Sequence, residues 1–268
     1  MKQTNKQREK IAILLTSKPN FNEFALKYFI LSMNNIQSTY EFVFPEIDEY
    51  FYTEKKYKRD SLFDSFTKVK IEIDFEGEPD YFINIIQSKI EGNWFFACNG
   101  NVAFITTDMW ERLFSPPSLF EYLLHSISAA LIFMHPKLDL DSHSETRGCT
   151  LDYTRDKKDD RVDISLGYLC DDCKQAIVEG AGLDYLNDIS IMVGRKWIGD
   201  INDFSSVAYN LKHFFKFNIN KQSGFNKTFL ERAKEHFPEI PKGIVIALFS
   251  GLIGVLITLL VLGLANKN

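Results

Sequence analysis

The first part of the chain alternates between short apolar runs and one longer amphipathic segment. Lys10–Thr16 is a continuous apolar run of strand length, and Tyr40–Phe44 alternates apolar and polar positions as a half-buried strand does. Between them, Phe21–Asn35 carries a broad apolar surface with helical spacing, and Asn20 or Asn22 can cap its start. The pattern predicts strand, helix, strand, which favours a parallel or mixed sheet.

The next segment predicts one helix and four strands. We expect a helix over Arg59–Phe66 and a half-buried or edge strand over Val69–Phe75, where apolar and charged residues alternate. Three further strands are predicted at Tyr81–Ser88, Trp94–Cys98 and Val102–Thr107, because Gly- and Asn-containing turns separate these apolar runs.

Helices dominate the second half of the pattern. Leu119–Met134 is strongly apolar, follows two prolines and a serine, and predicts a buried helix on the sheet. Shorter helices are expected over Lys174–Glu179, which Gly180 and Gly182 would end, over Asp203–Phe217 and over Lys227–Phe237.

The last apolar run is longer than the runs before it. Gly243–Leu264 contains 22 residues without a charge, with Lys242 before it and Lys267 after it. A helix of this length spans about 33 Å, close to the hydrocarbon thickness of a bilayer. We therefore predict a transmembrane helix at 241–264. Ser250 and Gly254 lie one turn apart and favour close packing, so the membrane helix is expected to self-associate.

Composition narrows the class of protein. The chain has 268 residues, 45% of them hydrophobic, and a net charge of −5. That charge makes nucleic acid an unexpected partner. The polar segment Met1–Lys10 does not open like a signal peptide, so we expect a tail anchor with the N-terminal domain in the cytoplasm and the lipid bilayer as a partner. In a reducing compartment, cysteines bind metal more often than they form disulfides.

Three of the four cysteines gather in one stretch with a histidine. His143 and Cys149 form an H-x5-C pair, and Cys170 and Cys173 form a C-x-x-C pair. Two short-spaced pairs can close a tetrahedron around Zn²⁺, and no coordination position then stays open for water. The pattern predicts a structural zinc module at 143–173, while Cys98 lies apart in a strand-like run. The balanced charges of Arg155–Arg161 inside the module predict a solvated loop.

The buried helix carries part of a second zinc motif. His125 and His135 are separated as are the first and third histidines of the zincin signature H-E-x-x-H-x-x-G-x-x-H. Superposition places Ser126 at the glutamate, Ala129 at the second histidine and Ile132 at the glycine, so three signature positions are lost.

With these motifs the chain resembles the archaemetzincins over roughly Lys10 to Ile177. That family has a long zinc motif, then a cysteine, a C-x-M element and a C-x-x-C pair that completes a structural zinc. Here His143 lies near the first cysteine position, Cys149–Leu151 occupies the C-x-M element, and Cys170 and Cys173 form the last pair. The resemblance implies a zincin-like fold with a structural zinc.

Two interpretations of the incomplete zincin signature stay open. Ala129 cannot bind metal and Ser126 is a poor base at neutral pH, which predicts a degenerate domain without catalytic residues. Alternatively, Glu121 lies one turn before His125, and these two residues with His135 could form a vestigial metal site.

The expected fold class is α+β, an α/β-type mixed sheet with helices, with a structural zinc module and one transmembrane helix. The expected domains are a zincin-like domain at 1–178, a helical extension at 179–240 and the membrane helix at 241–264. Three function classes follow: a membrane-tethered sensor or interaction module for a protein or small molecule, with the membrane effector of a bacterial stress or phage-defence system as a variant; an active membrane-anchored zinc metallopeptidase; and a structural anchor for a partner enzyme.

Overall fold

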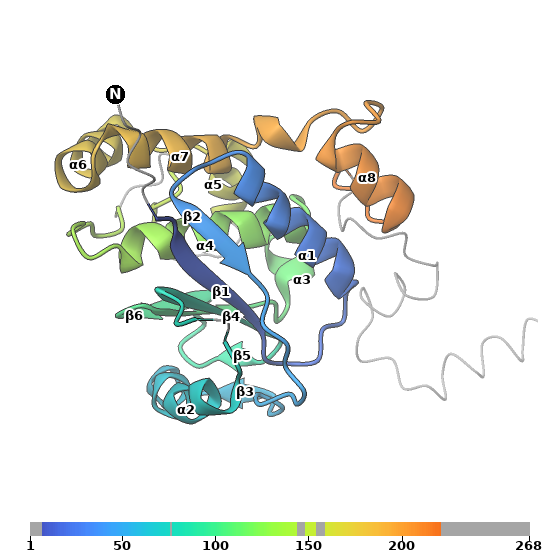
Figure 1. The fold of residues 1–268 in the computed structure, drawn as a ribbon, viewed down its shortest axis with the longest axis vertical. Helices are drawn as coiled ribbons and strands as arrows, with labels where there is room; N and C mark the ends of the chain where they lie inside the picture. The colour runs from blue at the N-terminus through green and yellow to red at the C-terminus, as the bar shows by residue number, and fades with distance from the viewer. Residues whose placement is uncertain (1–6, 76, 144–147, 154–158, 221–268) are drawn as a thin grey trace, which may run out of the picture. The chain divides into compact units, whose positions relative to one another are not determined.

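The computed structural model describes residues 7–75, 77–143, 148–153 and 159–220 (Figure 1). All of them belong to one compact unit, Met1–Phe225, and the second unit, Asn226–Asn268, lies outside the described residues. The predicted helix Lys227–Phe237 and the predicted span at 241–264 therefore lie outside them too. None of the helices in the described part of the chain has the length and hydropathy of a bilayer span.

A five-stranded mixed sheet forms the centre of the unit, in the order β2-β1-β4-β7-β6. The strands are β1 (Glu9–Leu15), β2 (Tyr40–Val43), β4 (Tyr81–Ile86), β6 (Phe96–Asn99) and β7 (Val102–Thr106). β1 is parallel to β2 and β4, and β7 is parallel to β4, whereas β6 runs antiparallel to β7. The mixed sheet is confirmed, and so are the strands predicted at Lys10–Thr16, Tyr40–Phe44, Tyr81–Ser88, Trp94–Cys98 and Val102–Thr107.

One face of the sheet is covered by α2 (Arg59–Glu72), beside the short parallel pair β3 (Lys56–Tyr57) and β5 (Lys89–Ile90) (Figure 1). The helix buries one apolar stripe against the sheet residues Ala12, Leu14, Phe82, Ile86 and Phe104. The edge-to-face contact between Phe66 and Phe82, with ring centroids 5.3 Å apart, is part of this layer.

The predicted strand at Val69–Phe75 is wrong, because α2 continues to Glu72. Leu62, Phe66, Val69 and Ile73 are buried at helical spacings of three and four residues, whereas Ile71, on the opposite side, is 81% exposed. The helical stripe that begins in the first half of α2 extends through the segment and outweighs its local alternation.

The other face is covered by more helices (Figure 1). The main ones are α1 (Glu23–Ser32), α4 (Leu119–Met134), α7 (Leu183–Gly194) and α8 (Val207–Phe214). The remaining elements are α3 (Trp110–Leu113), α5 (Asp160–Leu166), α6 (Asp171–Ala181) and the short helices η1 (Met33–Asn35) and η2 (Lys196–Ile198). The bounds of α4 agree with the predicted helix, and nearly all its residues are buried.

The segment after residue 178 packs into the same core as the sheet. On α7, the buried carboxylate of Asp188 accepts hydrogen bonds from the Ser38 backbone N–H and the Thr39 hydroxyl, at 2.9 and 2.7 Å. The hydroxyl groups of Tyr185 and Tyr40 lie 2.9 Å apart. The domain boundary predicted at 178 falls inside α6, and among the described residues both sides of it share one core.

Two side-chain amides cap the outer edge of β2. Asn34 accepts from the Phe42 backbone N–H at 2.8 Å and donates to the Phe42 carbonyl at 3.0 Å. Gln37 makes the same pair of bonds with Tyr40, at 2.7 and 2.8 Å. Because these residues are the alternate ones that face away from β1, the amides take the place of a sixth strand and block pairing with another chain.

Candidate metal centre

The structure brings the four predicted ligands together. The side chains of His143, Cys149, Cys170 and Cys173 place one ligand atom each within 4.8 Å of all the others. Among the described residues, no other group of three or more His, Cys, Asp and Glu side chains could share a metal ion. The three cysteines are at most 4% exposed.

The sulfur–sulfur distance between Cys149 and Cys173 matches that of a tetrahedral zinc site, and the imidazole nitrogen lies slightly closer to two sulfurs than it does in a metal-loaded site. His143 Nε2 lies 2.9 Å from Cys173 Sγ and 3.2 Å from Cys170 Sγ, and the sulfurs of Cys149 and Cys173 are 3.9 Å apart. A zinc tetrahedron with usual bond lengths has S–S edges of about 3.8 Å and N–S edges of about 3.5 Å. One imidazole and three thiolates suit Zn²⁺, so these four side chains form a zinc site.

Two backbone bridges, His143 with Asp152 and Cys149 with Tyr168, position the ligands together with the start of one helix. The segment carrying His143 pairs with the one carrying Asp152, through bonds from His143 N to Leu151 O and from Tyr153 N to His143 O. Cys170 is the N-cap of α6 and Cys173 lies in its first turn, so the start of one helix holds both sulfurs. The Cys170 backbone N–H also donates to Cys149 Sγ at 3.3 Å.

The thiols of Cys149 and Cys173 share a proton through a hydrogen bond. This bond lowers the pKa of Cys149 and raises the pKa of Cys173. A bound zinc ion takes the place of the shared proton and ionises all the ligating thiols. Cys98 differs, because burial alone raises its pKa to about 12, and it lies outside the group.

An acidic residue lies close to the metal centre. Asp163, on α5, is 1% exposed, and neither of its carboxylate oxygens has a hydrogen-bond partner. Burial, and then the charges of Asp152 and Cys149, raise the pKa of Asp163 to about 7. The carboxyl group is therefore protonated over much of the acidic range.

The residues proposed as a vestigial metal site are not brought together. Glu121 caps the start of α4, where its Oε2 accepts from the backbone N–H and the hydroxyl of Ser118, both at 2.8 Å. Its other oxygen accepts from Arg195 Nη1 at 3.0 Å, in an ion pair whose side chains are 14% and 21% exposed. Arginine therefore supplies the cation that neutralises this carboxylate.

The two histidines are far apart for a physical reason. α4 stays helical to Met134, so His135 lies about 15 Å beyond His125 along the helix axis. His135 packs against the ring of Tyr185, with centroids 4.6 Å apart, and its Nδ1 accepts from the Lys137 backbone N–H. His125 is buried, its Nδ1 has no partner, and burial and then Arg195 lower its pKa to about 3.

Arg195, the partner of Glu121, is a residue whose role sequence patterns do not reveal. It follows α7 with a φ of 57°, and 74 residues separate it from Glu121 along the chain. A positive φ is uncommon for a residue other than glycine, asparagine or aspartate. No periodic or spaced motif connects the two residues, so only the folded chain shows that they form a pair.

Comparison with solved structures shows a similarity in fold to a known protein. No protein-family model matches the chain, and no curated protein matches it. The crystal structure of archaemetzincin from Methanopyrus kandleri is similar, with 14% sequence identity and a TM-score of 0.43. The alignment covers 66% of this chain and 97% of the archaemetzincin chain.

Proposed function

We propose that this chain is a membrane-anchored interaction module whose body is a zinc-stabilised domain without peptidase activity. The observation that carries the proposal is the closed ligand set of His143, Cys149, Cys170 and Cys173. A catalytic zinc needs three protein ligands and an open position for water, whereas four protein ligands make a structural site. Zinc here stabilises the fold.

The arrangement on α4 supports the loss of catalysis. The glutamate nearest to His125 along the helix is bound to Arg195, and Ala129 and Ser126 replace a metal ligand and a general base of the zincin signature. The sequence resemblance to the archaemetzincins thus extends to the structural zinc and not to the peptidase motif. The body is a pseudoenzyme that recognises a protein or a small molecule.

The membrane part of the proposal rests on the sequence of Gly243–Leu264, which lies outside the described residues. Its uncharged length suits a single span that would anchor the body to a membrane. Packing through Ser250 and Gly254 would bring copies together. This architecture suits a membrane effector of a bacterial stress or phage-defence system, in which assembly of the bodies clusters the membrane helices.

Three measurements on the full chain test the proposal. We expect one zinc per chain, fractionation with membranes that alkaline carbonate does not reverse, and no cleavage of casein or of a peptide library. Two zincs per chain, with a chelator-sensitive cleavage that His125→Ala abolishes, would instead establish the active membrane-anchored metallopeptidase.

The effector variant has its own test. Expression of the full chain should depolarise the bacterial membrane under the conditions that trigger the system, and deletion of 241–268 should abolish the effect. Unchanged membrane potential at equal protein levels would eliminate this variant and leave the anchored interaction module.

A further inference from the structure

The α2 side of the sheet is only partly covered. In the register of β1 and β2, Lys10 pairs with Glu41 and Ala12 with Val43, so these four side chains share the face that α2 packs against. Ala12 is fully buried beneath that layer, whereas Val43 is only partly buried and Glu41 is exposed. Parallel strands are normally covered on both faces. No described helix or strand covers this face of the sheet over β2.

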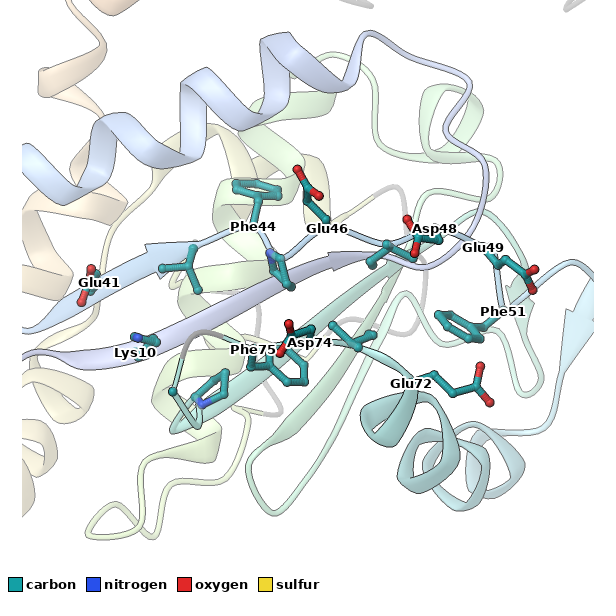
Figure 2. A pocket seen from close by; sticks show the side chains of 16 residues that line it. Lys10, Glu41, Phe44, Glu46, Asp48, Glu49, Phe51, Glu72, Asp74 and Phe75 are labelled. Carbon is teal, nitrogen blue, oxygen red and sulfur yellow. The ribbon is translucent and has the colours of Figure 1, made fainter.

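A groove of about 860 Å³ lies in the uncovered region (Figure 2). Its walls are the segment after β2 and the segment after α2. Its apolar lining includes partly buried residues that pack against the core beneath α2, namely Val43, Ile47, Phe51 and Phe75. The groove therefore exposes a continuation of the hydrophobic core.

The rim of the groove carries unbalanced negative charge. Six carboxylate side chains line it, and all six are exposed: Glu41, Glu46, Asp48, Glu49, Glu72 and Asp74 (Figure 2). Among the described residues that line the groove, Lys10 is the one cation. Within the part of the chain that the structure describes, none of the six carboxylates takes part in an ion pair. Such a concentration of one charge attracts and orients cationic partners.

The capped edge of β2 limits how a partner can bind. Asn34 and Gln37 already occupy the outward N–H and carbonyl groups of Phe42 and Tyr40. An added strand would have to displace both amides, so a partner gains little by pairing with the edge. A sheet face, in contrast, is the surface that a helix with one apolar stripe covers in α/β folds.

We propose that this groove binds a basic amphipathic helix of a partner protein. The apolar side of the helix would lie on Val43, Phe51 and Phe75, and lysine or arginine residues beside that stripe would reach the carboxylates on both walls. The proposal deepens the interaction role proposed above by naming its partner class, and it rests on that role. It does not depend on the membrane span, because every residue that it uses belongs to the described unit.

Binding of a designed peptide to the full chain in detergent tests the proposal. The probe is a fluorescent Leu/Lys peptide of about 14 residues with helical periodicity, long enough for roughly four turns. We expect saturable binding by fluorescence anisotropy at about 50 mM salt, weakening steeply as the Debye length shortens. A peptide of the same composition with strand-like alternation should bind at least about fivefold more weakly, because its lysines cannot form one helical face.

Matched variants distinguish binding in the groove from nonspecific attraction of the peptide to a negatively charged protein. The triple variant Glu46→Gln, Asp48→Asn, Asp74→Asn should raise the Kd for the helical peptide about tenfold. The control variant Asp139→Asn, Asp141→Asn, Asp184→Asn removes the same charge from exposed positions outside the groove and should leave the Kd within about twofold. Zinc content and Tm establish that both variants are folded.

Three results would overturn the proposal. These are equal weakening by the two triple variants, equal affinity for the two Leu/Lys peptides, and self-association of the chain that the groove variant abolishes, which would make a second copy the occupant. In each case one zinc per chain and firm membrane attachment would still support the anchored module. Loss of those two properties would count against the proposed function instead.

Discussion

His125 should make the stability of the protein depend on pH between pH 8 and pH 5.5. Its imidazole is 7% exposed on α4 and stays neutral, because burial and Arg195 lower its pKa from 6.5 to about 3. The unfolded chain binds a proton at this residue below pH 6.5, and the folded chain does not until far lower pH. The stabilisation is complete above pH 6.5 and is lost as the pH falls towards 3.

The size of the effect follows from the two pKa values. From pH 8 to pH 5.5 the wild-type protein should lose about 1.4 kcal/mol of unfolding free energy through this one residue, and by pH 4.5 about 2.7 kcal/mol. His125→Leu removes the titrating group and places an apolar side chain of similar size among the buried residues of α4. At pH 8 the substitution should therefore change stability by less than about 1.5 kcal/mol.

Urea unfolding of the zinc-loaded full chain at pH 8 and pH 5.5 checks this reasoning. The wild-type protein and the exposed control His213→Gln should show the same loss on acidification, and His125→Leu should show about 1.4 kcal/mol less. Identical pH dependence in wild type and His125→Leu would refute it. A second zinc that is present in wild type and lost in His125→Leu would show that His125 binds metal, and the inactive interpretation would fail with it.

Three further predictions concern the metal centre and the sheet edge. Cys173→Ser should reduce bound zinc, measured by mass spectrometry of metals, to near zero and destabilise the protein by more than about 4 kcal/mol, whereas Cys98→Ser should keep one zinc per chain. Asp163, whose pKa of about 7 lies above its unfolded value, should destabilise the fold as the pH rises from 4 to 8. The unfolding free energy of Asp163→Asn relative to wild type should therefore be roughly 2–4 kcal/mol higher at pH 8 than at pH 5, as measured by denaturant unfolding. Asn34→Leu removes the cap from Phe42, should cost about 1–3 kcal/mol, and should cause dimerisation that light scattering detects; a monomer of unchanged stability would contradict the capping role.

The parts of the fold that the sequence predicts are those whose signals are local. α4 has an apolar period, a Ser118 cap and prolines before it, so its start is defined by neighbouring residues. The zinc ligands come in two short-spaced pairs, and a metal site requires them to converge. Asn22, one of two candidate caps, does accept from the backbone N–H groups of Phe24 and Ala25.

The sequence-based predictions fail where contacts between residues far apart in the chain determine the local structure. α5 begins at Asp160, within a charged stretch predicted as a solvated loop, and Asp160 is 2% exposed because the folded chain covers it. α6 continues through Gly180 and ends before its C-cap Gly182, so of the two glycines predicted to end it only the second does. A Cβ on Gly180 would lie 2.5 Å from the carbonyl oxygen of Lys137, so this glycine allows close packing instead of ending the helix.

The metal centre and the groove lie in different layers of the same sheet, which separates their roles. The zinc-binding cysteines belong to the core on the α4 side, and the groove residues Val43, Ile47, Phe51 and Phe75 pack against the core on the α2 side. Occupation of the groove should therefore stabilise the native state by mass action without changing the zinc content. Removal of zinc should weaken peptide binding only to the extent that it unfolds the protein. If partly unfolded, zinc-free protein bound the peptide as tightly as the native form, the uncovered sheet face would not be the binding surface.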